Sequence, residues 1–314
     1  SIFDNPVIST NAKYLKQVKQ HLKKYKIKNY KIVLEPAKRN TAPAILSTAL
    51  IKDIPDNQPL MFFSSDHLIE KVNIFNNAIY KNKSNLTDQN IFIFGIKPKS
   101  PSSEYGYFLT KKVKGNINKV TKFIEKPNIK LAEEFIKDKR FTWNSGMFLF
   151  KAKVIVNEIE KYCPEIISSC RGALKKKIND LYFEKIDKKE FNLCPNISLD
   201  KAVMEKTQTC LVMPINIGWS DIGGWKSFWD NSKKDKYGNV LLGDVIQKYG
   251  QNNLINSEHR LVVGLGIENL IIIETKAPES AEPRANAIPR LNSPKPGRIT
   301  ISAPAKPEAI ASQR

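Results

Sequence analysis

The sequence contains few of the residues that build metal clusters and covalent cross-links. Among 314 residues there are only three histidines and four cysteines, and no two cysteines are spaced as CxxC. This composition argues against a zinc site and favours reduced, mostly buried thiols. No run of about 18 apolar residues occurs, so a transmembrane helix is not expected. The first residues show neither the basic nor the apolar region of a secretion signal, which predicts a cytoplasmic protein without a membrane partner.

The common glycine-rich nucleotide loops are also missing from the sequence. No GxxxxGK[ST] motif occurs, which argues against a P-loop NTPase. The only GxG, Gly264-Leu265-Gly266, lacks the third glycine of a dinucleotide-binding loop and lies near the wrong end of the chain.

Acidic residues are outnumbered by basic ones. Lys and Arg total 51 against 31 Asp and Glu, a formal net charge of +20. The lysines are scattered, and short clusters such as Lys175-Lys176-Lys177 carry no aromatic pattern for stacking on bases. We therefore interpret the charge as a solvated surface that suits anionic phosphate substrates, with no nucleic-acid partner. A non-catalytic basic binding protein remains the alternative from a different class.

Short apolar runs alternate with segments of helical periodicity along most of the chain. Strands are expected at 31–34, 60–63, 91–96 and 210–214, and helices at 42–54, 72–80, 154–174 and 199–205. This alternation predicts an α/β fold with helices on both faces of a sheet. Ligands in such folds bind beyond the carboxyl ends of the strands, where Glu35 and Asp66 are expected.

Two changes in composition suggest domain boundaries. Residues 1–232 form the expected α/β domain, and short apolar runs separated by Gly and Asn predict the start of a β-rich domain over 233–276. Residues 277–314 hold 7 of the 18 prolines and no aromatic residue, which predicts a disordered tail. The abrupt change near Ala277 suggests a frameshift or a fusion junction.

Six short motifs follow one another along the chain. They are Glu35-Pro36-Ala37-Lys38-Arg39-Asn40-Thr41-Ala42-Pro43, Ser64-Ser65-Asp66-His67, Tyr105-Gly106-Tyr107, Phe123-Ile124-Glu125-Lys126-Pro127, Trp143-Asn144-Ser145-Gly146-Met147-Phe148 and Gly218-Trp219-Ser220-Asp221-Ile222-Gly223-Gly224-Trp225. In this order they closely resemble the bacterial mannose-1-phosphate guanylyltransferases, over about residues 3–275. The resemblance implies a nucleotide-diphospho-sugar transferase fold, Rossmann-like with a mixed sheet. It also implies transfer of a guanylyl group from GTP to mannose 1-phosphate, in GDP-mannose and polysaccharide biosynthesis, and allows a homodimer.

The resemblance points to Asp66 and Asp221 as catalytic carboxylates that bind Mg²⁺. Phosphoryl-type transfer depends on in-line positioning and neutralised oxyanions, and Mg²⁺ typically uses few protein ligands. Ser64-Ser65 replaces the family's Pro-Ala before the first of these aspartates. From the residues alone, each aspartate could instead be a helix cap or a turn former.

Substrate residues follow from the same resemblance. Glu35, Arg39, Asn40 and Thr41 match the family's purine-reading segment, although Asn40-Thr41 could also cap the following helix. On the sugar side, the matching residues are Gly106, Tyr107, Glu125, Lys126 and Asn144, with Lys126 also counted as catalytic. Glu125-Lys126 could otherwise be an exposed ion pair.

The family's N-terminal loop, of the form GGxGxRLxPLxR, has no counterpart in the printed sequence. That loop stabilises the departing pyrophosphate with backbone N–H groups and cationic side chains. We therefore expect impaired turnover by these residues alone. Another sugar-1-phosphate nucleotidyltransferase is the alternative within the same class.

Overall fold

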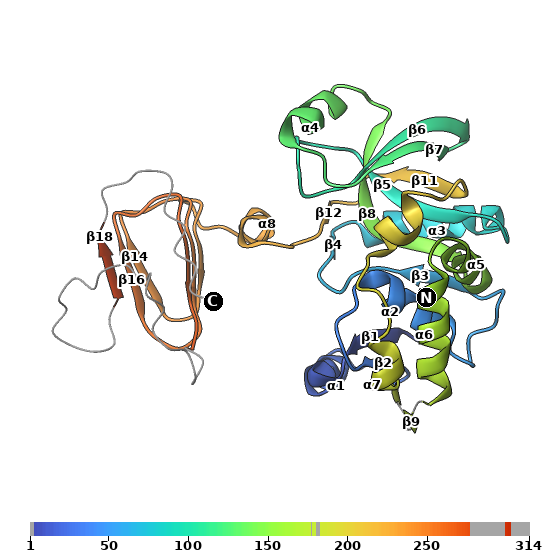
Figure 1. Cartoon of the computed structure of the whole chain (residues 1–314). Helices are drawn as coiled ribbons and strands as arrows, with labels where there is room; N and C mark the ends of the chain where they lie inside the picture. The colour runs from blue at the N-terminus through green and yellow to red at the C-terminus, as the bar shows by residue number, and fades with distance from the viewer. Residues whose placement is uncertain (1–2, 177, 180–182, 277–298, 303–314) are drawn as a thin grey trace. The chain divides into compact units, whose positions relative to one another are not determined.

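The computed structural model describes residues 3–176, 178–179, 183–276 and 299–302 (Figure 1). These residues belong to two compact units, Ser1–Trp219 and Ser220–Arg314. The sequence placed the boundary at residue 232, whereas the division falls after Trp219. Within the described ranges, no helix is long and apolar enough to cross a membrane.

The larger sheet of the first unit has six strands in the order β3-β8-β5-β11-β7-β6. Their bounds are β3 Pro59–Phe62, β5 Ile91–Ile96, β6 Tyr107–Lys114, β7 Ile117–Ile124, β8 Phe141–Lys151 and β11 Cys210–Ile215. Strand β11 runs parallel to β5, while β8 is antiparallel to both β3 and β5. The sheet is therefore mixed.

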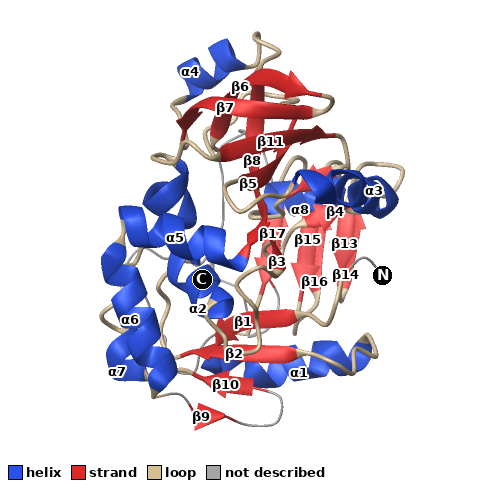
Figure 2. Ribbon diagram, turned by 90° about the vertical axis from the view of Figure 1, so that its right-hand side faces the viewer, coloured by secondary structure: helices blue, strands red, loops and turns tan. Residues whose placement is uncertain are grey.

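Helices cover both faces of this sheet because β5 is apolar on both sides. Ile91 and Ile93 pack in one core cluster, and Phe92 and Phe94 pack in the other. The first cluster includes residues of α2 (Thr41–Ala49), α5 (Ala152–Tyr162) and α6 (Pro164–Lys175), and the second includes residues of α3 (Val72–Asn82) and α4 (Ile129–Phe135). Figure 2 shows α5 and α6 on one side of the sheet and α3 on the other.

A smaller sheet follows the order β1-β2-β10-β9. Its strands are β1 Val7–Asn11, β2 Lys31–Glu35, β9 Ile178–Asn179 and β10 Phe183–Lys185. Strands β1 and β10 both run parallel to β2, and α1 (Leu15–Lys24) connects β1 to β2. Glu35 is the last residue of β2 and is paired in register with Asn11.

Three expected helices differ from the observed ones. The helix expected over 42–54 is α2, which ends at Ala49. Residues 154–174 were expected to form one helix, but α5 ends at Tyr162 and α6 begins at Pro164. Proline lacks the N–H that a continuous helix needs and is well suited to a first helical position. The segment expected as a helix over 199–205 is a single π-helical turn, η3 (Asp200–Met204).

The remaining elements of the first unit are short. They are η1 (Ala12–Tyr14), η2 (Lys83–Asn85), α7 (Lys188–Phe191) and the pair β4 (Leu68–Ile69) and β12 (Trp219–Ser220). The unit ends within β12, at Trp219.

The second unit contains α8 (Trp225–Asn231) and two parallel three-stranded sheets. One sheet contains β13 (Val240–Leu242), β15 (Leu254–Ser257) and β17 (Ile271–Glu274), and the other contains β14 (Val245–Lys248), β16 (Val262–Leu265) and β18 (Ile299–Ser302). Strand β18 lies inside the segment expected to be a disordered tail, so the expectation and the structure differ at these four residues. The rest of 277–314 lies outside the described residues.

Candidate active site

Three residues assigned to the sugar side meet at one point of the first unit. A Cβ added to Gly106 would stand 2.6 Å from Oε2 of Glu125 and 2.7 Å from Cε2 of Phe123. The backbone N–H of Asn144 donates to the carbonyl oxygen of Gly106 at 2.7 Å. Only glycine leaves room for the carboxylate of Glu125 so close to the backbone. Residues before β6, after β7 and within β8 are thereby brought together.

The side-chain amide of Asn144 is held at both ends. Its Nδ2 donates to Oδ1 of Asp200 at 2.6 Å, and its Oδ1 accepts from the backbone N–H of Gly146 at 2.9 Å. Asp200 was not among the predicted site residues. The only signal in the sequence was its place in Ser198–Lys206, a segment that was interpreted as a helix resembling a segment of the family.

The carboxylates of Glu125 and Asp200 lie close together at this point. Burial raises the pKa of Glu125, the nearby carboxylate of Asp200 raises it further, and the ammonium of Lys126 opposes the increase. Burial also raises the pKa of Asp200, against the stabilising bond from Asn144. Lys126 itself has φ +45°, in the left-handed region that costs a non-glycine residue about 1–2 kcal/mol. Backbone strain of this kind often occurs at functional sites.

Tyr107 is located differently from its predicted neighbours. Its side chain is fully buried, and its hydroxyl donates to the carbonyl oxygen of Ser102 and accepts from the N–H of the same residue, each at 3.1 Å. The structure therefore gives Tyr107 the role of anchoring the loop that carries Gly106. The side chain has no exposed surface for a ligand.

Glu35 occupies the carboxyl end of β2, as the sequence predicted. It is 9% exposed, and its Oε1 accepts from the hydroxyl of Ser9 at 2.5 Å. Burial raises the pKa of this carboxyl group, and the bond from Ser9 opposes the increase. A carboxylate has acceptor capacity for further donors beyond one hydroxyl.

The residues after Glu35 shape the start of α2. Asn40 has φ +67°, and its side chain accepts from the N–H of Thr41 at 2.9 Å. This is the cap that the residues alone allowed. The Nη2 of Arg39 donates to the carbonyl oxygen of Asn192 at 2.7 Å.

Thr41 joins the two groups of predicted residues. Its Oγ1 accepts from the N–H of Leu199 at 2.9 Å, and the next residue, Asp200, holds Asn144. The purine-side and sugar-side residues are therefore connected through one short segment.

The two predicted metal ligands lie in different units. Asp66 is exposed in the turn between β3 and β4. Asp221 accepts from the N–H of Gly223 at 3.3 Å through its Oδ1, the geometry of an Asx turn. Ile222, between Asp221 and Gly223, has φ +41°, which is unusual for a β-branched residue. Joint metal binding by Asp66 and Asp221 stays a prediction.

The donor chemistry of these aspartates fits magnesium. In the part of the chain that the structure describes, no group of three or more His, Cys, Asp or Glu side chains is arranged to hold a metal. Mg²⁺ does not need such a group, because it is usually bound by one or two carboxylates and by substrate phosphates.

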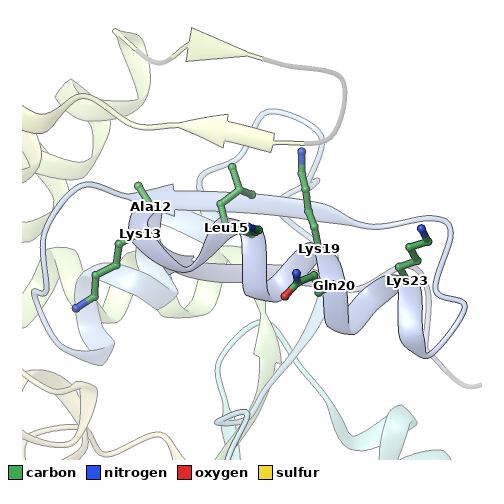
Figure 3. Close-up of a pocket in the computed structure, with 7 residues that line it drawn as sticks. Ala12, Lys13, Leu15, Lys19, Gln20 and Lys23 are labelled. Atoms are coloured by element: carbon green, nitrogen blue, oxygen red, sulfur yellow. The ribbon is translucent and has the colours of Figure 1, made fainter. Parts of the chain in front are cut away.

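A hollow of about 590 Å³ lies along α1, and none of these residues is in its lining (Figure 3). Its lining includes four lysines, Lys13, Lys16, Lys19 and Lys23. In Figure 3 the side chains of Lys13, Lys19 and Lys23 point in different directions. These three side chains therefore do not converge as the donors of an anion site would.

Comparison with known proteins identifies the class. Residues 1–238 match the sequence model described as Nucleotidyl transferase, and the chain belongs to that family. Among its relatives, it is 40% identical over 283 residues to mannose-1-phosphate guanylyltransferase 2 of Escherichia coli O157:H7, and 36% identical over 281 residues to mannose-1-phosphate guanylyltransferase of Escherichia coli K12. These alignments cover 86% and 87% of this chain but only 58% and 59% of the relatives. The resemblance expected from the six motifs is confirmed.

Solved structures agree with the predicted fold class. One neighbour, described as a mannose-6-phosphate isomerase from Helicobacter pylori, has a TM-score of 0.64 and 30% identity, over 70% of this chain and 85% of its own. Another, described as a mannose-1-phosphate geranyltransferase from Thermus thermophilus, has a TM-score of 0.70 over 86% of this chain and 77% of its own. At 22% identity, the second shows the fold alone. The nucleotide-diphospho-sugar transferase fold is therefore confirmed.

Proposed function

We propose that this chain carries the guanylyl-transfer site of a mannose-1-phosphate guanylyltransferase. The reaction joins GTP to mannose 1-phosphate, forms GDP-mannose and releases pyrophosphate. The observation that carries the proposal is the meeting of Gly106, Glu125 and Asn144 from three separate segments. The names of the relatives supply the sugar and the base.

On the sugar side, the proposed roles follow from donor and acceptor chemistry. Glu125 accepts from sugar hydroxyls, and Asn144 has a second Nδ2–H and an Oδ1 lone pair left for them. Lys126 offsets the negative charge of the sugar phosphate, whose oxygen attacks the α-phosphorus. The reaction needs no covalent intermediate, because positioning and charge neutralisation supply most of the catalysis.

On the purine side, we assign base recognition to Glu35. Guanine presents an amine and an N1–H on one edge, and a buried carboxylate can accept from both. Adenine lacks these two donors, so its binding would leave the buried carboxylate with only the hydroxyl of Ser9 as a donor, which is costly. The segment from Arg39 to Thr41 shapes the loop next to this carboxylate.

We assign the cation to Asp66 and Asp221. When bound, Mg²⁺ supplies positive charge to the phosphate oxygens as the transfer proceeds. Each carboxylate would offer oxygen ligands to the ion. This assignment rests on the resemblance and on the donor chemistry.

The reaction also needs donors for the departing pyrophosphate. The family's glycine-rich loop provides them, and residues 1–314 contain no such motif. Each donor of this kind contributes about 10²–10³ in rate. We therefore propose that residues 1–314 alone turn over at least about 10²-fold more slowly than the same residues joined to a family loop.

The test is pyrophosphate release from mannose 1-phosphate and each nucleoside triphosphate, by the chain with and without the loop segment. We expect release with GTP and little with ATP, UTP or dTTP, and we expect glucose 1-phosphate to be the poorer sugar. A preference for another base or sugar supports a different sugar-1-phosphate nucleotidyltransferase. Salt-sensitive DNA binding without any turnover supports the basic binding protein.

A further inference from the structure

Asp200 carries a carboxylate in an unfavourable place. Part of the residue is exposed, but its carboxylate is surrounded by protein. This burial is the main reason that the pKa of Asp200 is raised. Glu205 adds a second carboxylate nearby, while Lys126 only partly compensates. Among the described residues, no ion pair within 4.0 Å includes Asp200.

Glu184 shows what a structural carboxylate looks like in the same unit. It is 4% exposed, and its Oε1 forms an ion pair with Nζ of Lys31 at 2.7 Å. Its charge therefore has a close partner, and removing that charge leaves Lys31 with Asp53 as its remaining carboxylate partner. The charge of Asp200 has no comparable partner, so its ionised form costs folding free energy. Groups that are kept at such a cost are frequent at functional sites.

The benefit of the Asp200 carboxylate lies in its effect on Asn144. A carboxylate only accepts, so Nδ2 of Asn144 must point toward it, and Oδ1 must point toward the N–H of Gly146. An asparagine at position 200 presents both a donor and an acceptor, so only the N–H of Gly146 would then oppose a turned-over amide of Asn144. Together with the N–H of Gly146, the carboxylate therefore fixes which atoms of Asn144 remain for a ligand.

The backbone brings Asp200 to this position by an irregular turn. Asp200 is the first residue of the π-helical turn η3, directly after Leu199, which is bonded to Thr41. Single π-turns are rare in proteins, and those that occur are often found at functional sites.

We propose that Asp200 is a positioning residue of the sugar side: by accepting from Asn144, it orients that amide toward the hydroxyl groups of a hexose 1-phosphate. The inference rests on the proposed function, and it adds a residue that acts through Asn144 without touching the sugar.

The experiment compares the loop-joined parent with its Asp200→Asn, Asp200→Ala and Glu184→Gln variants. Pyrophosphate release gives KM for mannose 1-phosphate and for GTP separately, and thermal unfolding gives Tm. For Asp200→Asn we expect the sugar-phosphate KM to rise about tenfold, with the GTP KM unchanged and Tm equal or higher. Asp200→Ala should raise the same KM at least as much. Glu184→Gln should lower Tm and leave both KM values unchanged.

Each outcome has one meaning. An active parent whose sugar-phosphate KM is unchanged by both Asp200 variants overturns the inference and leaves the proposed function standing. A lower Tm for Asp200→Asn with both KM values raised together also overturns it, because this is the result of a structural role. A loop-joined parent that turns over no sugar phosphate overturns the proposed function, and the inference with it.

Discussion

Replacing Gly106 by alanine should damage the sugar side selectively. The added Cβ would lie 2.6 Å from Oε2 of Glu125 and 2.7 Å from Cε2 of Phe123. Real Cβ atoms essentially never approach other heavy atoms to within 3.0 Å, so one or both groups must move. The ring of Phe123 is stacked on Phe108 at 4.6 Å between centroids, which restrains it. The flexible carboxylate of Glu125 therefore moves most.

The size of the effect follows from this displacement. To regain an ordinary contact, the carboxylate must shift by about 1 Å, and a misplacement of that size can reduce the rate about 10²-fold. We expect kcat/KM for mannose 1-phosphate to fall about 10–100-fold while the GTP KM is unchanged. Overpacking should also cost about 1–3 kcal/mol of stability. In a domain of this size, Tm should fall by roughly 2–4 °C per kcal/mol.

Gly172→Ala is the matched control. Its Cβ would meet Oε2 of Glu190 at 3.0 Å, which is the far end of a flexible side chain. Gly172 lies inside α6, where alanine is favoured over glycine by about 1 kcal/mol. We expect both KM values of this control to be unchanged and its Tm to be equal or higher. A Gly106→Ala variant with the kinetics of the parent would refute the placement of Glu125 in the site.

Three other substitutions test the purine side, the buried aspartate and the helix cap. Glu35→Gln should lower kcat/KM for GTP about 10-fold or more, because a charged hydrogen bond is worth about 1.5–3 kcal/mol. The loss should be smaller for inosine triphosphate, which lacks the 2-amino group. Equal losses for both nucleotides would contradict recognition of the base by Glu35. The pKa of Asp200 is raised on folding, so its protonated form favours the folded state below about pH 4, and this contribution is lost as pH rises through the folded-state pKa. The Tm of Asp200→Asn should therefore exceed that of the parent by an amount that grows with pH across this window. A constant difference in Tm would contradict the pKa shift. Asn40→Ala loses the cap and places alanine at φ +67°, so unfolding in denaturant should show that the free energy of unfolding falls by about 1–2 kcal/mol. Asn40→Gly should lose less. Equal stability of the parent and both variants would contradict the cap.

Elements with a clear hydrophobic pattern were predictable from the sequence. Strand β5 was expected at 91–96 and is found there, because a run that is apolar at every position fits a strand covered on both faces. The expected helix over 154–174 failed because periodicity continues smoothly through Cys163, while Pro164 restarts the hydrogen-bond pattern. A π-turn could not be told from an α-helix at 199–205, since the two share the same apolar spacing over so few residues.

The candidate site was predictable only where a motif marked it. Gly106, Glu125 and Asn144 were found because each lies in a short, distinctive motif, and the structure brings them together. Asp200 was missed because nothing in its own neighbourhood shows that its partner lies 56 residues earlier. Tyr107 was placed with the site, but an aromatic residue at the start of a strand also fills a core, and here it is fully buried.

The central claim is that this chain contains a site for GDP-mannose. The most direct test is thermal unfolding of the purified chain with GDP-mannose and Mg²⁺, beside UDP-glucose and single-stranded DNA. A ligand that binds the folded state at 100 times its Kd stabilises it by about 2.7 kcal/mol. The account predicts a rise in Tm with GDP-mannose that UDP-glucose and DNA do not give. A Tm that is unchanged by GDP-mannose, or raised equally by UDP-glucose, would contradict it.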